Sequence, residues 1–166
     1  VQALNTVEEI QNLSLKNNKE LVVYLSMAFG NPYSENYHPD IVAELTEKLH
    51  QLDVGMVALS DTIGVSSPTN IAPLFSTLIQ EYPTIEFGAH FHTTSDKWEE
   101  KVESAYQNSC RRFDAALKGY GGCPMAKDDL VGNMPTEKLI AYFIEDLELD
   151  SAALGKSLAL IGTIFK

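Results

Sequence analysis

Apolar residues along the chain follow two patterns that alternate with each other. Short apolar runs begin near residues 21, 54, 85 and 112, and each has the length and composition of a buried strand; the last run predicts a strand over 113–117. The segments between these runs carry apolar residues at helical spacing. Two of the segments begin with Pro39 and Pro68, and proline suits the first turn of a helix. The pattern predicts β/α units of about 30 residues, with parallel strands buried on both faces.

Six helices are predicted around these strands. We expect them over residues 5–17, 39–52, 68–79, 95–108, 135–147 and 152–165.

Two α/β architectures accommodate such repeats. One is an open, doubly wound sheet, and the other is four of the eight units of a (β/α)₈ barrel. Both architectures place reactive groups at the carboxyl ends of the strands. The strand ends of this chain carry an asparagine, an aspartate, two histidines and a glycine-rich segment with a cysteine. The reactive residue types therefore gather where either fold would use them.

The third apolar run ends in two histidines, His90 and His92. Side chains two residues apart on a strand point to the same face, so both imidazoles are aimed into one space. Such a pair is a common way to hold a divalent metal ion with open coordination positions. The alternative is two ordinary histidines at a strand end. The gathering of reactive residues at the other strand ends favours the metal site.

Three further residues are candidates at these ends, each with a structural alternative. Asp61 could accept a proton or orient a substrate hydroxyl, or it could be a turn aspartate. Cys123 follows Gly121 and Gly122, and this flexible loop could carry a thiol for proton transfer or a buried structural thiol. Asn133 could supply a metal-ligating oxygen, or it could mark the entry to the helix that follows.

Composition narrows the possible partners. The 166 residues include 23 acidic and 12 basic side chains, which give a net charge of -11 and disfavour nucleic acid or an anionic membrane as a partner. No apolar run is long enough to span a membrane, and the first residues do not resemble a signal peptide. Two cysteines form no disulfide framework, so a reducing compartment is expected, and Cys110 is interpreted as a buried structural thiol.

Five segments together resemble one known family. They are 30–33 (Gly-Asn-Pro-Tyr), 60–64 (Ser-Asp-Thr-Ile-Gly), 90–92 (His-Phe-His), 119–124 (Gly-Tyr-Gly-Gly-Cys-Pro) and 132–133 (Gly-Asn). Their order and spacing resemble the 3-hydroxy-3-methylglutaryl-CoA lyases, which belong to the metal-dependent lyase and acyl-synthase TIM barrels. The Gly-Gly-Cys-Pro sequence distinguishes these lyases from the synthases for isopropylmalate or homocitrate. The resemblance implies that residues 1–147 form a partial TIM-barrel catalytic domain with strands five to eight of the barrel, and that residues 148–166 form a helical extension of the same domain.

The resemblance also implies a role for each candidate residue. His90 and His92 would bind the metal ion, with His90 also near the reacting groups, and Asn133 would supply a further oxygen. Cys123 would handle protons on the cleaved product, and Asp61 would be the acid/base or substrate-orienting carboxylate. The implied reaction is the cleavage of 3-hydroxy-3-methylglutaryl-CoA to acetyl-CoA and acetoacetate. This ligand set suits Mg²⁺ or Mn²⁺ and would tolerate Zn²⁺ or Co²⁺.

The chain departs from the family pattern in several ways. Thr93 stands where the family often has aspartate, Ser60 stands where glycine is frequent, and the loop from Cys123 to Asn133 is one residue longer than in some members. No segment resembles the first four strands, so we expect the missing N-terminal half of the barrel to be a partner and this piece to be inactive alone. An acyl-CoA substrate, a homodimer and a cytoplasmic location, or a mitochondrial one in a eukaryote, are further expectations.

Three alternatives remain open from the residues. The first is a related aldolase or Claisen-type synthase that acts on a 2-oxo acid and does not use the loop thiol. The second is a half-barrel that serves only as a binding or assembly module. The third is a flavodoxin-like binding domain, although the segment after the first strand lacks the glycines and hydroxyls of a phosphate-binding loop.

Overall fold

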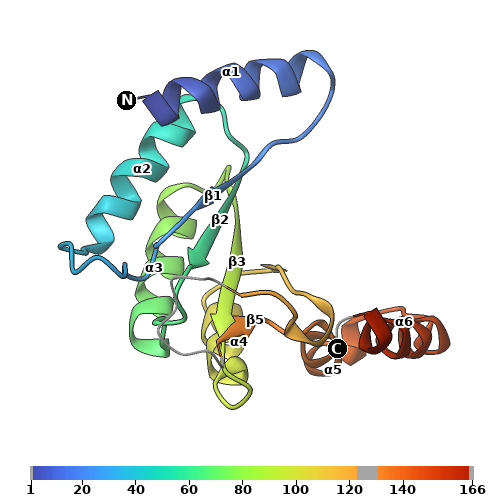
Figure 1. The fold of residues 1–166 in the computed structure, drawn as a ribbon. Coiled ribbons are helices and arrows are strands. Elements are labelled where there is room, and N and C mark those ends of the chain that lie inside the picture. Colours follow the sequence, from blue (N-terminus) through green and yellow to red (C-terminus); the bar gives the residue numbers. More distant parts are fainter. Residues whose placement is uncertain (1, 123–130, 165–166) are drawn as a thin grey trace.

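A parallel sheet of four strands forms the centre of the computed structural model, which describes residues 2–122 and 131–164 (Figure 1). The strands are β1 (Val22–Leu25), β2 (Met56–Asp61), β3 (Glu86–Thr93) and β4 (Arg112–Phe113). They lie side by side in chain order, and each pair of neighbours is parallel. A doubly wound sheet reverses its strand order at a switch point, and these four strands do not. The order therefore confirms the predicted β/α repeats and favours consecutive units of a barrel.

The helices follow the strands as the sequence predicts. Figure 1 shows α2, α3 and α4 along one side of the sheet. The proline starts of α2 and α3 are confirmed, and at α3 the Asn70 side-chain oxygen also accepts a hydrogen bond from the Ser67 backbone at 2.8 Å. The helices are α1 (Gln2–Lys16), α2 (Pro39–Gln51), α3 (Pro68–Glu81), α4 (Trp98–Gln107), α5 (Thr136–Tyr142) and α6 (Ser151–Ile164), with 3₁₀ turns at Leu117–Gly119 and Ile144–Asp146.

The main core lies between the sheet and these helices. Alternate residues of β3, namely Phe87, Ala89 and Phe91, are buried on the helix side. Phe91 packs edge-on against Phe75 of α3, with ring centroids 6.4 Å apart, and Phe75 is fully buried. Burial of a side chain of this size contributes about 1.5–3 kcal/mol to stability. This packing sets which face of β3 points away from the helices.

The last strand and its return differ from the predicted pattern. The expected strand over 113–117 ends at Phe113, because the chain then leaves β3: Ala116 forms an isolated bridge with Pro135, and a 3₁₀ helix follows at Leu117. An unpredicted short strand, β5 (Gly132–Asn133), returns antiparallel to the end of β3. Two residues are too few to show a period of two, so the sequence pattern gives no signal for β5.

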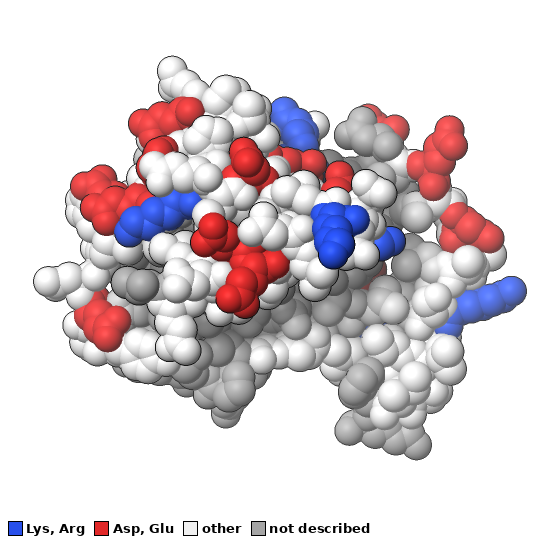
Figure 2. Space-filling view, turned by 90° about the horizontal axis from the view of Figure 1, so that it is seen from above, with Lys and Arg blue, Asp and Glu red and all other residues white. Residues whose placement is uncertain are grey.

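The C-terminal tail is helical, and acidic side chains are common on the surface. The predicted C-terminal helix is present as α6, and its Leu160 and Ile164 are largely exposed. Within the described ranges, no helix is both long enough and apolar enough to cross a membrane. Figure 2 shows acidic side chains spread over the face seen from above, with lysine and arginine side chains between them.

Candidate active site

The two histidines of the 90–92 motif lie together on the side of β3 that faces away from the helices. Phe91, which stands between them, packs against α3, so the alternation of the strand turns both imidazoles to the other side. Their ring centroids are 5.4 Å apart. His92 is buried, whereas the His90 side chain is 31% exposed. The structure therefore places the pair in one space at the carboxyl end of a central strand.

Asn133 joins this pair through strand pairing. In the antiparallel ladder between β3 and β5, Asn133 is the direct partner of His92. The Asn133 side-chain nitrogen donates to the carbonyl of Tyr120 at 2.9 Å, which orients the amide and its oxygen. Three residues that the sequence singled out separately are thus adjacent in space.

The two predicted loop glycines are needed for close packing around Asn133. Gly121 has a φ of +85°, and a Cβ atom there would lie 2.8 Å from the Asn133 side-chain nitrogen. A Cβ atom on Gly122 would lie 2.9 Å from the carbonyl oxygen of Val131. The backbone N–H of Asn133 also donates to the carbonyl of Gly121 at 3.1 Å. The glycines therefore let the loop approach β5 closely, and their flexibility stays a prediction.

The electrostatics of the histidine pair suit a metal ion. Burial first, and the neighbouring His90 second, lower the pKa of His92 below its ordinary value, so its imidazole tends to stay neutral with a lone pair to donate. The Nδ1 atoms of both rings are buried and have no hydrogen-bond partner in the part of the chain that the structure describes. A buried nitrogen without a partner costs about 1–3 kcal/mol, and a cation bound at His92 Nδ1 could remove that cost there.

The donor set at this edge is two imidazoles and one amide oxygen. Within residues 2–122 and 131–164, no three His, Cys, Asp or Glu side chains are grouped closely enough to hold a metal ion. A metal at this edge would therefore need Asn133 and at least one ligand from elsewhere. Nitrogen and oxygen donors of this kind fit a divalent first-row metal ion or Mg²⁺.

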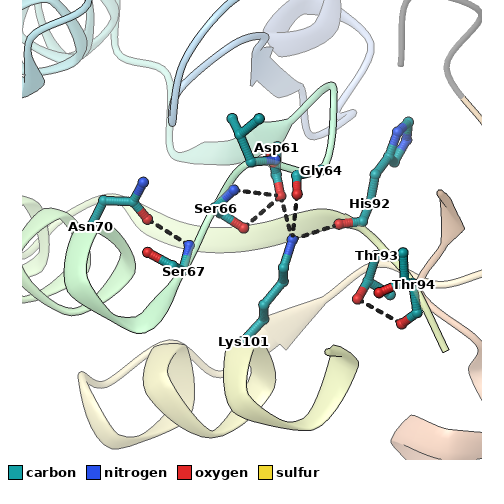
Figure 3. A network of polar contacts seen from close by, with 10 residues as sticks. Asp61, Gly64, Ser66, Ser67, Asn70, His92, Thr93, Thr94 and Lys101 are labelled. Carbon is teal, nitrogen blue, oxygen red and sulfur yellow. Dashed lines mark hydrogen bonds and ion pairs between the residues drawn. The ribbon is translucent and has the colours of Figure 1, made fainter. Parts of the chain in front are cut away.

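The Asp61 carboxylate lies near the His92 backbone but on the opposite face of the sheet from the two imidazoles, in contrast to its expected role as an acid/base at the mouth. It pairs in register with Phe91, whose side chain faces the helices, and its own side chain is fully buried. Its carboxylate accepts a hydrogen bond from Lys101 Nζ at 2.7 Å and others from the loop that follows β2 (Figure 3). A carboxylate whose oxygens are already occupied on the opposite side of the sheet is poorly placed to exchange protons with a substrate near His90.

Only one of the two cysteines, Cys110, lies in the described part of the chain. Cys123, the expected proton donor, lies outside the described residues, so its role stays a prediction. Cys110 is fully buried, which confirms its interpretation as a structural thiol. Burial raises the pKa of Cys110 to about 12, so its thiol is not ionised near neutral pH.

Asp114 and Tyr24 add a carboxylate and a phenol beside His90, and the sequence analysis missed both. The Tyr24 hydroxyl donates to Asp114 Oδ2 at 2.6 Å, and the same oxygen is 3.4 Å from His90 Nδ1. That separation permits an ion pair when His90 is protonated, although the two groups are not aligned as a hydrogen bond. His90 first, then Tyr24 and Arg112, hold the pKa of Asp114 below its usual range against the effect of burial. One feature of the sequence could have revealed Asp114. Arg112 and Asp114 are charged residues two positions apart at the start of an otherwise apolar run, so they share one face of the strand.

A cavity of about 460 Å³ lies where these groups meet. Its lining includes Tyr24, His90, Asp114 and Asn133. A larger cavity of about 640 Å³ lies between β4 and α5, but its lining is mainly apolar and contains none of the candidate residues. The smaller cavity is therefore the candidate active site, because the polar and titratable groups converge on it.

The family model and similar known proteins point to the same family. Residues 2–159 match the HMGL-like family model. The hydroxymethylglutaryl-CoA lyase YngG of Bacillus subtilis is 29% identical over 148 residues, which are 89% of this chain and 49% of that protein. The (R)-citramalyl-CoA lyase of Chloroflexus aurantiacus is 35% identical over 121 residues, 73% of this chain and 38% of that protein.

Solved structures agree with the sequence comparison. The crystal structure of the Bacillus subtilis HMG-CoA lyase superposes with a TM-score of 0.78 at 29% identity, over 86% of this chain and 47% of the other. An HMG-CoA lyase from Acinetobacter baumannii, solved with coenzyme A and 3-methylmalate, gives a TM-score of 0.75 at 29% identity, over 87% and 47% of the two chains. The chain thus spans at most about half the length of these relatives.

Proposed function

The chain belongs to the HMGL-like family, and from that premise we propose that it forms the C-terminal half of a lyase that cleaves 3-hydroxy-3-methylglutaryl-CoA to acetyl-CoA and acetoacetate. The observation that supports this most strongly is the pairing of His92 with Asn133, beside His90, at one end of the sheet. The relatives named as hydroxymethylglutaryl-CoA lyases make this substrate the first choice.

His90, His92 and Asn133 would hold the divalent metal ion in this proposal, with Mg²⁺ or Mn²⁺ preferred and Zn²⁺ or Co²⁺ tolerated. When bound, such an ion polarises the oxygen atoms of the substrate and makes its hydroxyl group more acidic. Asp114 would orient the His90 ring through Nδ1, which leaves the other ring nitrogen, Nε2, for the metal ion, because a carboxylate beside a ligating histidine fixes the position of the ring.

The bond changes can be followed through the substrate. The hydroxyl group gives its proton to a base that the other half of the barrel would supply, its oxygen becomes the new ketone oxygen, and the adjacent carbon–carbon bond breaks. The electron pair of that bond stays with the acetyl-CoA fragment as an enolate, which then takes up one proton at carbon. We assign this protonation to Cys123, as the family resemblance implies. No proton transfer is assigned to Asp61, because its carboxylate is buried and paired with Lys101 on the other side of the sheet.

The missing half of the barrel would supply the remaining ligands and close the site. The direct test is to co-express this chain with the N-terminal half of the Bacillus subtilis HMG-CoA lyase and to follow acetoacetate release in the presence of Mg²⁺ or Mn²⁺. Cleavage is expected only when both halves and the metal ion are present. A folded, metal-loaded assembly that does not cleave the substrate would contradict the proposed reaction.

A second candidate substrate is (R)-citramalyl-CoA. The lyase named for that substrate is 35% identical to this chain over 121 residues, about as similar as the mitochondrial hydroxymethylglutaryl-CoA lyase of Pongo abelii, which is 36% identical over 124 residues. The same assembly should therefore be assayed with both thioesters. A higher kcat/KM for (R)-citramalyl-CoA would keep the lyase class and change the substrate.

Replacement of Cys123 by alanine distinguishes a lyase from a 2-oxo-acid synthase of related fold. We expect turnover to fall about 100- to 10,000-fold, the usual contribution of a positioned proton donor. Acetoacetate release by the co-expressed assembly measures the loss. The Cys110→Ala variant is the control for a general effect of thiol removal, and it is expected to retain turnover once it is folded. An unchanged rate for Cys123→Ala would favour a synthase-type site that does not use the thiol.

Replacement of Asp114 by asparagine is expected to weaken Co²⁺ binding and turnover about 10- to 100-fold, the usual effect of losing a partner of a metal-ligating histidine. Co²⁺ affinity is measured on the co-expressed assembly by absorption spectroscopy. The matched control is Asp40→Asn, since Asp40 also lies beside a histidine, His38, but both side chains are exposed on the surface. Equal affinities in the two variants would show that Asp114 does not orient His90.

A further inference from the structure

Lys101 places an ammonium group in the interior of the molecule, between the sheet and α4 (Figure 3). The residue is 1% exposed, and its Nζ atom has three oxygen partners. These are Asp61 Oδ2 at 2.7 Å, the Gly64 carbonyl at 3.2 Å and the His92 carbonyl at 2.9 Å. An ammonium group has three donors, so its hydrogen-bonding capacity is filled. A lysine is rarely buried in this way, because the loss of water must be offset by an ion pair and well-formed hydrogen bonds.

The first two partners of Lys101 hold the loop that follows β2. Besides Lys101, Asp61 accepts hydrogen bonds from the backbone of Val65 at 2.8 Å and from the backbone and hydroxyl of Ser66 at 3.0 and 2.5 Å. The loop is therefore wrapped around the carboxylate, and Lys101 neutralises that carboxylate from α4. Through the Gly64 carbonyl, Lys101 also binds the loop directly.

The third partner is the backbone of a candidate metal ligand. The ladder between β2 and β3 ends with the pair Asp61 and Phe91, so His92 lies one residue beyond it. His92 is instead paired with Asn133 of β5. The bond from Lys101 to the His92 carbonyl thus holds β3 where β2 no longer supports it. Figure 3 shows this carbonyl directed at Lys101 and the imidazole directed away.

We propose that Lys101 is a positioning residue for the candidate site: its ammonium group fixes the His92 backbone and the loop 62–66, and thereby the His92 ring and the paired Asn133, where a metal ion would bind. The inference rests on the proposed function, because it takes His92 as a metal ligand. Lys101 acts through the backbone and touches neither substrate nor metal ion. Its loss should weaken metal binding about 10- to 100-fold, as the loss of other groups that orient metal ligands does.

The experiment compares two variants and one control variant with the unchanged chain, all in the assembly with the N-terminal half of the Bacillus subtilis lyase. Lys101→Met keeps a long unbranched side chain but leaves the Asp61 charge buried alone, so it is expected to destabilise the protein. The double variant Asp61→Asn/Lys101→Met removes both charges and should restore much of the stability. Lys48→Met, which removes an exposed lysine from α2, is the charge-matched control for Lys101→Met, whereas the double variant leaves the net charge unchanged. Co²⁺ affinity is read from visible absorption, and circular dichroism at the same temperature confirms that each protein is folded.

Positioning and a purely structural role give different results for the double variant. If Lys101 positions His92, the folded double variant binds Co²⁺ at least about 10-fold more weakly than the unchanged assembly, whereas Lys48→Met binds it normally. If Lys101 only stabilises the fold, the double variant recovers stability and Co²⁺ affinity together, and the inference is overturned. If the unchanged assembly binds no Co²⁺, the proposed metal site fails, and this inference fails with it. Equal weakening of Co²⁺ binding by Lys48→Met would also overturn it.

Discussion

Replacement of His92 by alanine is expected to abolish metal-dependent cleavage by the assembled barrel, with a fall in turnover of about 1,000-fold or more. His92 is buried, its pKa is lowered, and it is paired with Asn133, so its neutral imidazole is the best-placed nitrogen donor of the site. A metal ion at an enzyme site contributes several kcal/mol to transition-state stabilisation, and each 1.36 kcal/mol corresponds to a factor of ten in rate. Acetoacetate release and Co²⁺ affinity, measured on the same preparation, test the expectation.

The control for this substitution is His50→Ala. His50 lies exposed on α2 and has a ring contact with Tyr82, away from the candidate site. Its replacement should leave both turnover and Co²⁺ affinity close to those of the unchanged assembly. A folded His92→Ala variant that retains Co²⁺ affinity would exclude His92 as a ligand, whatever its effect on turnover.

Replacement of Asp61 by alanine is expected to lower the free energy of unfolding by about 3–5 kcal/mol, because it leaves the Lys101 ammonium group buried without its counterion. The variant also removes the carboxylate that accepts hydrogen bonds from the backbone N–H groups of Val65 and Ser66. The Asp61 carboxylate and the Lys101 ammonium group are both buried almost completely, so water cannot replace the lost partner. Urea denaturation of the chain, followed by circular dichroism, measures the change.

Two comparisons separate this structural effect from a role in catalysis. Glu44→Ala removes an exposed carboxylate from α2 and should change the free energy of unfolding by no more than about 0.5 kcal/mol. An Asp61→Ala protein with unchanged stability but no turnover would instead support the acid/base role that the family resemblance implies. A large loss of stability would explain any loss of turnover by the breakdown of the buried network.

The predicted fold agrees with the structure where the signal was local. The β/α alternation, the helix starts at Pro39 and Pro68, and the shared face of His90 and His92 depend on residues a few positions apart. Periods of 3.6 and 2 encode such features directly. The expected fourth strand was too long and β5 was missed, because both depend on where the chain turns back towards β3.

The sequence by itself determined the repeating units, the strand ends at which reactive residues gather, and the face that His90 and His92 share. Only the tertiary structure decided that Asp61 faces the helices, that Lys101 is buried against it, and that Tyr24 reaches Asp114 beside His90. These pairs are separated by 40 and 90 positions in the chain. A lysine in an amphipathic helix looks like a surface residue in the sequence, and a tyrosine in a strand looks like core. Their partners are set by the packing of whole elements, so the periodicity of either element alone could not identify them.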